Sequence, residues 1–269
     1  MTTDRGAAVV VGVDGSDAAL AAVRGASEEA VARGVPLRLV HATGRTQTTS
    51  QSVTEGRPEL GYAEAVLHAA ASVVDSRAGS LVQTEILWGA AVDELVAEST
   101  HAALLAVGSL GMGRIARTIL GSTAAAVAGA AACTVAIIRP DAYGVAPAGW
   151  LTVVFDESPD NDKVVTAAMQ EARLRGNRVF AVAARRDGPE LSYDALDRRV
   201  AELTTRFPDV RVALVATSNG IARFVAENWH EGICMVVIGD TDADAIPRLV
   251  GPCGDGHVRH AGCSVLLVR

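Results

Sequence analysis

The chain has 269 residues, enough for two domains of ordinary size, and it is 49% hydrophobic but only 4% aromatic, which predicts a core of Ala, Val, Leu and Ile. The net charge of −7 argues against a surface for nucleic acid or for anionic membranes. No apolar run reaches the ~18 residues of a membrane-spanning helix, and the first residues lack the features of a signal peptide, so we expect a cytoplasmic protein with no membrane partner.

Apolar runs typical of buried strands alternate with helical patterns along the first half of the chain. We expect strands near residues 7–13, 36–42, 81–87, 102–108 and 134–138. Between these strands we expect helices near residues 17–33, 59–78, 90–100 and 121–131. This alternation is typical of a parallel sheet whose strands are connected by helices.

The second half shows the same alternation. Its strands are expected near residues 150–156, 178–184, 210–216, 233–239 and 263–268. The pattern predicts an α/β fold with a doubly wound, parallel, five-stranded sheet in each half. Ligands of such sheets bind beyond the carboxyl ends of the strands, where the strand order reverses. Site-like residues follow the first and fourth strands, so we expect these two strands to be neighbours.

Three matched segments indicate that the chain is a tandem duplication. The pairs are Val11–Ser16 with Val153–Ser158, Glu29–Gly34 with Glu171–Gly176, and Ala132–Arg139 with Gly262–Arg269. The matches occur in the same order in both halves. We therefore predict domains over residues 1–140 and 150–269, joined by a linker at about 140–149 that is rich in Pro and Gly.

The strongest functional signal follows the predicted fourth strand. The run Gly108-Ser109-Leu110-Gly111-Met112-Gly113 comes after buried apolar residues, and Gly121-Ser122-Thr123 precedes a predicted helix. Glycines let the backbone approach a ligand closely, and a helix N-terminus presents free N–H groups to anions. These features predict a phosphate site. Lys163 is the only lysine, which excludes a Walker A loop because that motif requires Gly-Lys-Ser/Thr.

Taken with Val11-Gly12-Val13-Asp14-Gly15-Ser16, the spacing Gly108-x2-Gly111-x9-Gly121-Ser122 resembles the ATP-binding subclass of the universal stress protein family. The resemblance covers the whole chain as a tandem of two such domains. It implies a Rossmann-like strand order of 3-2-1-4-5, with ATP bound across the ends of the first and fourth strands. It also implies a homodimer formed through the fifth strand, and a stress-response regulator that acts through its conformation or a protein partner.

The resemblance implies a role for each position of the motif. Gly12 and Asp14 would face the adenosine end of ATP, where Asp14 would also receive a hydrogen bond or help to bind Mg²⁺, and the backbone of Ala42 would contact adenine. The residues expected around the ribose and phosphates are Gly108, Ser109, Gly111, Gly113 and Arg114, and those at the terminal phosphates are Gly121, Ser122 and Thr123. Leu110 stands where family loops often carry a basic residue, which removes one charge contact.

Three residues near this motif also have a purely structural interpretation. Asp14 is suited to capping the first helix, and Arg114 to being a solvated loop charge. His41, at the end of the predicted second strand, is best interpreted as a packed structural histidine. The sequence leaves these alternatives open.

The second half contains a degraded copy of the motif. Asp156 and Gly239 match Asp14 and Gly108. The positions that differ are Val154 opposite Gly12, Asp242 opposite Gly111, and Pro252 opposite Ser122. Proline lacks an N–H group, and the carboxylates of Asp240, Asp242 and Asp244 would repel phosphates. We predict that the second half does not bind ATP as the first half does.

Two further patterns contain residue types that bind metals. As a calcium loop, Asp240-x-Asp242-x-Asp244 fails, because Ala245 stands at the glycine position and Gly251 at the glutamate position. Cys253, His257, His260 and Cys263 form a zinc-competent set. However, Cys263 matches Cys133, which no histidine accompanies, and nearby glycines weaken the helix that would hold the set. We expect no metal site here, and we expect Cys133, Cys234 and Cys263 to be buried thiols.

Catalysis is not evident from the sequence. Ser122 and Thr123 have no activating partner nearby, so we predict nucleotide binding with at most slow hydrolysis. One alternative is a slow ATPase or nucleotidyl-transfer enzyme that uses Asp14 with Mg²⁺. Another is a nucleotide-independent interaction protein, in which the apolar strands at residues 135–138 and 265–268 would be pairing edges.

Overall fold

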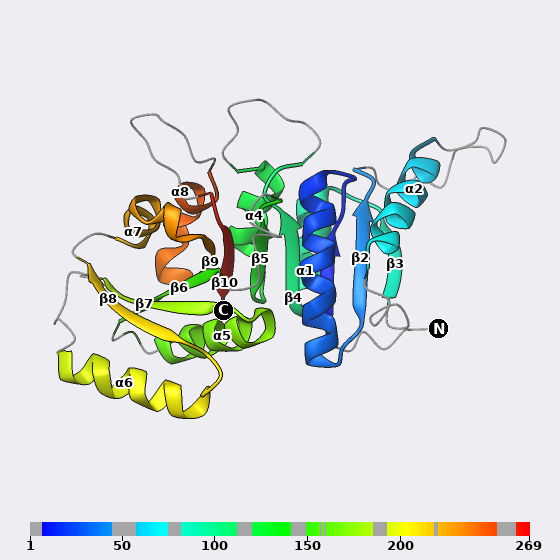
Figure 1. Cartoon of the computed structure of the whole chain (residues 1–269). Helices are drawn as coiled ribbons and strands as arrows, with labels where there is room; N and C mark the ends of the chain where they lie inside the picture. The colour runs from blue at the N-terminus through cyan, green and yellow to red at the C-terminus, as the bar shows by residue number, and fades with distance from the viewer. Residues whose placement is uncertain are drawn as a thin grey trace. The chain divides into compact units, whose positions relative to one another are not determined.

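The computed structural model describes residues 7–44, 58–74, 82–111, 120–140, 149–156, 158, 160–184, 193–217, 220–251 and 262–269. The chain divides into two compact units, residues 1–140 and residues 141–269 (Figure 1). Most of the predicted linker at 140–149 lies outside the described residues. In the described part of the chain, no helix is long and apolar enough to cross a membrane.

The first unit alternates strands and helices throughout. Its elements are β1 (Ala8–Gly12), α1 (Asp17–Arg33), β2 (Leu37–Ala42), α2 (Pro58–Ser72), β3 (Val82–Leu87), α3 (Ala91–Ser99), β4 (Ala102–Gly108), α4 (Ser122–Ala130) and β5 (Val135–Ile138). All neighbouring strands are parallel, in the order β3-β2-β1-β4-β5. The predicted elements are present, although the second helix ends at Ser72 rather than at residue 78.

The second unit repeats this topology. Its strands are β6 (Trp150–Phe155), β7 (Arg178–Ala184), β8 (Val212–Thr217), β9 (Ile233–Gly239) and β10 (Ser264–Val268). Its helices are α5 (Asn161–Arg175), α6 (Tyr193–Arg206), α7 (Ile221–Glu227), η2 (Trp229–Glu231), η3 (Asp240–Ala245) and α8 (Ile246–Val250). The strands are parallel in the order β8-β7-β6-β9-β10, which is the order 3-2-1-4-5 in repeat numbering. The predicted fold class is confirmed.

The central strand of the first unit shows why these runs are strands. Val9, Val10 and Val11 of β1 are at most 1% exposed, because neighbouring strands flank them and helices cover the sheet. Continuous apolar runs are typical of strands that are buried on both faces. The small alanines of α1 let this helix pack against β1 and β4 (Figure 1). The helix begins at its N-cap Ser16 and ends at Gly34, which has a φ of 64°.

The strand order places a ligand crevice in each unit. In the first unit, β1 lies between β2 and β4, and the chain reverses its direction of winding between β1 and β4. Gly12 pairs in register with Val107, so β1 and β4 end at the same edge of the sheet. β6 and β9 occupy the same places in the second unit. Doubly wound sheets bind their ligands at this switch point.

Candidate functional site

A cavity of about 650 Å³ opens at the switch point of the first unit. The predicted site residues that line it are Gly12, Asp14, Ala42, Gly108, Gly111, Gly121, Ser122 and Thr123. Ser109 is not among the lining residues, and Gly113 and Arg114 lie outside the described residues. The structure thus brings together the ends of β1, β2 and β4 and the beginning of α4, which are far apart in the sequence.

Asp14 is held in the turn that follows β1. Its Oδ1 accepts a hydrogen bond from the Ser16 N–H at 3.0 Å. The cap of α1 is Ser16 itself, whose Oγ accepts from the Ala19 N–H at 3.1 Å. A Cβ atom on Gly111 would lie 2.6 Å from Asp14 Oδ2. Gly111 therefore leaves the space that the Asp14 carboxylate occupies, and Asp14 orients the cap rather than being the cap.

Packing requires one other glycine of the motif and favours a second. A Cβ atom on Gly108 would lie 2.7 Å from the backbone carbon of Ala18, so only glycine lets α1 approach the end of β4 this closely. A Cβ atom on Gly12 would lie 3.0 Å from the Leu95 side chain of α3. The sequence interpretation assigned both glycines to ligand contact alone, and it missed Leu95, which also lines the cavity.

The beginning of α4 presents backbone donors to the cavity. Gly121 is the N-cap, without a side-chain cap, and its own N–H donates to the Ser109 carbonyl at 2.8 Å. The first helical bond runs from the Ala125 N–H to the Gly121 carbonyl. Within the described residues, the N–H groups of Ser122, Thr123 and Ala124 have no acceptor. These groups and the dipole of α4 make a corner whose chemistry suits an anion.

Ser109 is a structural residue of this corner. It is 1% exposed, its N–H donates to the Ile138 carbonyl at 2.9 Å, and its carbonyl accepts from Gly121. The backbone of Ser109 therefore ties the end of β4 to β5 and to the beginning of α4. The sequence interpretation placed this residue against the ribose and phosphates.

The cavity has few charged side chains. Among the described lining residues, the titratable groups are Asp14 and His41, and none is Lys or Arg. His41 is 8% exposed, and its Nδ1 lies 2.7 Å from the Val13 carbonyl oxygen, as expected for a packed structural histidine. Within the described lining, backbone N–H groups are therefore the main groups that could hold an anion.

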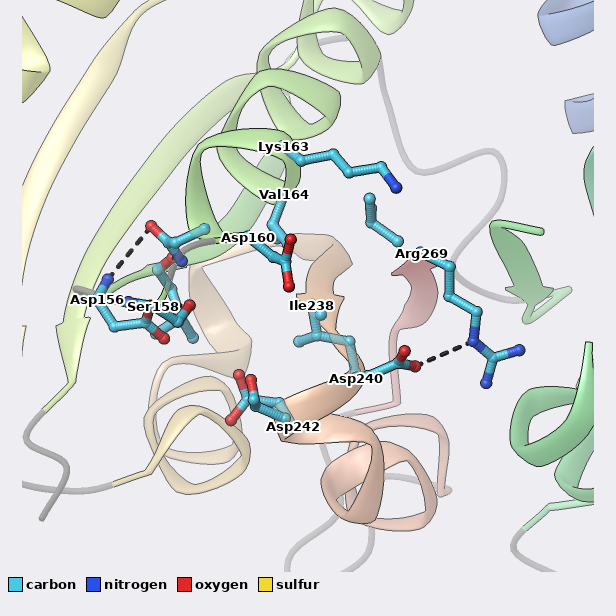
Figure 2. Close-up of a pocket in the computed structure, with 14 residues that line it drawn as sticks. Asp156, Ser158, Asp160, Lys163, Val164, Ile238, Asp240, Asp242 and Arg269 are labelled. Carbon is cyan, nitrogen blue, oxygen red and sulfur yellow. Dashed lines mark hydrogen bonds and ion pairs between the residues drawn. The ribbon is translucent and has the colours of Figure 1, made fainter. Parts of the chain in front are cut away.

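The matching cavity of the second unit is smaller, at about 260 Å³. Figure 2 shows the carboxylates that surround it, with Lys163 and Arg269 on one side. The carboxylates belong to Asp156, Asp160, Asp240 and Asp242. The Arg269 Nε donates to Asp240 Oδ1 at 3.0 Å, so part of this positive charge is already paired within the protein (Figure 2). Negative groups therefore outnumber positive groups around this cavity.

Side chains also fill the floor of the second cavity. Asn161, at the position of Ala19, donates through Nδ2 to the Val154 carbonyl at 2.8 Å and accepts from the Asp156 N–H at 3.3 Å. It is 3% exposed. Val154, in place of Gly12, is 2% exposed. The sequence comparison identified Val154 but missed Asn161.

The acidic loop differs from its prediction in one residue. Asp240 and Asp242 line the cavity, but Asp244 does not, because residues 240–245 form the 3-10 helix η3. The Asp244 carboxylate instead lies 3.6 Å from Arg248. Pro252 lies outside the described residues, so its prediction is untested.

The structure describes only some of the residues in the cysteine and metal-site predictions. Cys263 is buried, whereas Cys133 and Cys234 are half-buried. Burial raises the pKa of the Cys234 thiol. Cys253, His257 and His260 lie outside the described residues.

Comparisons with known proteins identify the family. The family model described as "Universal stress protein family" matches residues 7–139. Universal stress protein Rv2624c of Mycobacterium tuberculosis is 40% identical over 265 residues, covering 97% of this chain and 96% of the relative. Universal stress protein Rv2028c of the same organism is 35% identical over 266 residues, covering 97% and 95%.

A solved structure supports the fold along the whole chain. The universal stress protein from Archaeoglobus fulgidus DSM 4304 has a TM-score of 0.68 at 16% identity, and the match covers 97% of this chain and 96% of that chain. Two units of the same topology, each with its own switch-point cavity, fit a tandem arrangement. The chain belongs to the universal stress protein family, in its tandem two-domain form.

Proposed function

We propose that the first unit binds ATP and that the protein is a regulatory nucleotide-binding module. The observation that carries the proposal is the set of N–H groups of Ser122, Thr123 and Ala124, which have no acceptor among the described residues and border the same cavity as Asp14 and Gly111. Phosphates bind at helix N-termini of this kind. The cavity of about 650 Å³ also lies within the ~300–1,000 Å³ range of small-molecule sites.

The orientation of ATP follows from the two ends of the cavity. The beginning of α4 suits the phosphates, and the ends of β1 and β2, with Val40 and Ala42, suit the adenosine. Asp14 is the one carboxylate among the described lining residues. Since Mg²⁺ takes oxygen ligands and is commonly bound by a carboxylate together with substrate phosphates, this donor set fits Mg²⁺ that arrives with ATP.

The proposal is one of binding rather than rapid hydrolysis. Within the described lining, no hydrogen bond links the side chain of Ser122 or Thr123 to Asp14 or His41, so neither hydroxyl is in contact with a base that would activate it. We infer that nucleotide binding changes the conformation of the protein and thereby its contact with a protein partner. A second copy of the chain, in a homodimer, is one such partner.

For the second unit we propose that ATP does not bind as it does in the first. Its cavity has less than half the volume, its floor carries Asn161 and Val154, and its rim carries carboxylates. Phosphate groups would meet like charges there.

The test is the nucleotide stoichiometry of the purified full chain. The protein is denatured, the supernatant is analysed by ion-exchange chromatography, and the emptied protein is titrated with MgATP, ADP and cyclic AMP by calorimetry. We expect one MgATP site per chain. Two sites would contradict the assignment of the second unit, and no binding of any nucleotide would reject the proposal in favour of an interaction protein.

A further inference from the structure

Two consecutive backbone carbonyls at the end of β1 are held by side chains from other elements. The Nδ1 of His41, in β2, lies 2.7 Å from the Val13 oxygen. Because a carbonyl oxygen only accepts, this nitrogen carries the proton. The Tyr62 hydroxyl, in α2, donates to the Asp14 oxygen at 3.0 Å. The two rings meet edge to face, with centroids 5.7 Å apart.

The second unit holds the matching carbonyl in the same way, with different chemistry. There, the Nη1 of Arg199 donates to the Asp156 oxygen at 2.9 Å. Arg199 lies in α6, which follows the second strand of its repeat as α2 does in the first. Ala183 stands at the position of His41. In both units the helix after the second strand thus anchors the carbonyl of the aspartate that follows the first strand.

This anchored carbonyl belongs to the residue whose side chain enters the first cavity. Asp14 Oδ1 accepts from the Ser16 N–H, and Asp14 Oδ2 lies 2.6 Å from the place that a Cβ on Gly111 would take. Because the carbonyl and the carboxylate belong to one residue, a shift of the Asp14 backbone would displace the carboxylate from this place. Tyr62 itself is 45% exposed and is not a lining residue of the cavity. Tyr62 can therefore influence the site by holding Asp14, and not by contacting a ligand.

We propose that Tyr62 is a positioning residue for the nucleotide site of the first unit. Its hydroxyl fixes the Asp14 peptide and couples α2 to the cavity, which makes the affinity for nucleotide depend on where α2 lies. The inference rests on the proposed function for its ligand, whereas the anchoring of Asp14 by Tyr62 is independent of it.

The test compares Tyr62→Phe with the full-length wild type. Phenylalanine keeps the ring against His41 and removes only the hydroxyl. We expect MgATP to bind about 3- to 10-fold more weakly in calorimetry, which corresponds to the loss of roughly one hydrogen bond. Without nucleotide, we expect faster amide hydrogen exchange in the turn at residues 13–16, with an unchanged midpoint of thermal unfolding.

The control is Arg199→Gln, which breaks the corresponding bond of the second unit together with the ion pair between Arg199 and Asp162. It should speed exchange near Asp156 and leave the affinity for MgATP unchanged. The inference is overturned if Tyr62→Phe binds MgATP as wild type does, or if its affinity falls only together with its thermal midpoint. If wild type binds no nucleotide but Tyr62→Phe still speeds exchange at residues 13–16, the proposed function fails while the anchoring role of Tyr62 is supported.

Discussion

The two switch-point cavities share one backbone plan and differ in the groups that face a ligand. Asp14 and Asp156 each accept a hydrogen bond from the N–H two residues later, at 3.0 Å and 2.9 Å. Around this common turn, the first unit presents glycines and free N–H groups, whereas the second presents carboxylates and Asn161. The comparison teaches that the fold preserves the turn without preserving the groups that line the cavity.

The strongest test of this difference is to substitute each residue of the matched pair Gly111 and Asp242 by the other. Gly111→Asp adds a side chain whose Cβ would lie 2.6 Å from Asp14 Oδ2, and it places a second carboxylate beside the phosphates. We expect a loss of MgATP affinity of about 100-fold or more, because like charges at such distances cost several kcal/mol. Calorimetry measures the loss.

Two controls accompany this exchange. Gly111→Ala separates the steric effect of a Cβ from the effect of the charge, and circular dichroism checks that each variant folds. Asp242→Gly should create no second site, because Asn161 and Val154 still fill the floor of that cavity. A second MgATP site in Asp242→Gly would contradict our account of the second unit.

The matched glycines at the ends of β4 and β9 should differ in their effect on stability. In Gly108→Ala, the new Cβ would lie 2.7–2.8 Å from backbone and Cβ atoms of α1, so we expect a loss of about 1–3 kcal/mol. In Gly239→Ala, the nearest atom is a methyl carbon of Val164 at 3.1 Å, and we expect a loss below about 1 kcal/mol. Urea unfolding, fitted with separate transitions for the two units, measures both values. Equal losses would show that α1 can shift to make room for the new Cβ atom.

A proline at the beginning of α4 imitates the second unit without breaking the helix. Ser122 is the first residue of α4, and Gly121 before it has φ −64° and ψ 146°, which suits a residue that precedes proline. Ser122→Pro removes an N–H and a hydroxyl, and we expect about 10-fold weaker MgATP binding. Ser122→Ala removes only the hydroxyl and should have a smaller effect. Equal effects in titrations would argue against a backbone contact with phosphate.

The smallest expected effect is a pH dependence confined to the second unit. The hydrogen bond from Arg173 holds the pKa of the Asp209 carboxyl below its ordinary value of 3.8. A lowered pKa stabilises the folded state above the unfolded pKa, and the contribution disappears as the pH falls through the folded pKa. Asp209→Asn should therefore lower the thermal midpoint of the second unit slightly at about pH 7, and by less at a pH well below 3.8, because the contribution is lost as the carboxyl becomes protonated. An equal difference at both pH values would rule out this carboxylate as the cause.

Particular elements show why so much of the fold could be predicted. Parallel strands that are buried on both faces have continuous apolar sequences. Residues 102–108 form such a run, and the structure has a strand, β4, with the same bounds. The repeated pairs Asp14 and Asp156, and Gly34 and Gly176, mark the same turns in both halves. The glycine spacing after β4 marked the cavity, because close approach of backbone segments requires glycine.

The side-chain contacts between separate elements could not be predicted, because no local sequence pattern indicates them. Tyr62 lies on an exposed helical position, and nothing in its neighbourhood of the sequence indicates that it reaches Asp14. The packing of Leu95 against Gly12 and the bonds that Asn161 makes with Val154 and Asp156 likewise depend on how separate segments pack. Asp244 is turned away from the cavity by the geometry of η3.

The sequence by itself therefore determined the duplication, the strand order implied by the family resemblance, and the location of a glycine-lined cavity after β4. These depend on local periodicity and on glycine, whose backbone freedom is visible in the chain alone. Only the tertiary structure decided which residues surround each cavity, how large the cavity is, and what holds Asp14 in place. The reason is physical: a side-chain contact between distant segments is fixed by the packing of helices on the sheet, and that packing is set by the whole unit at once.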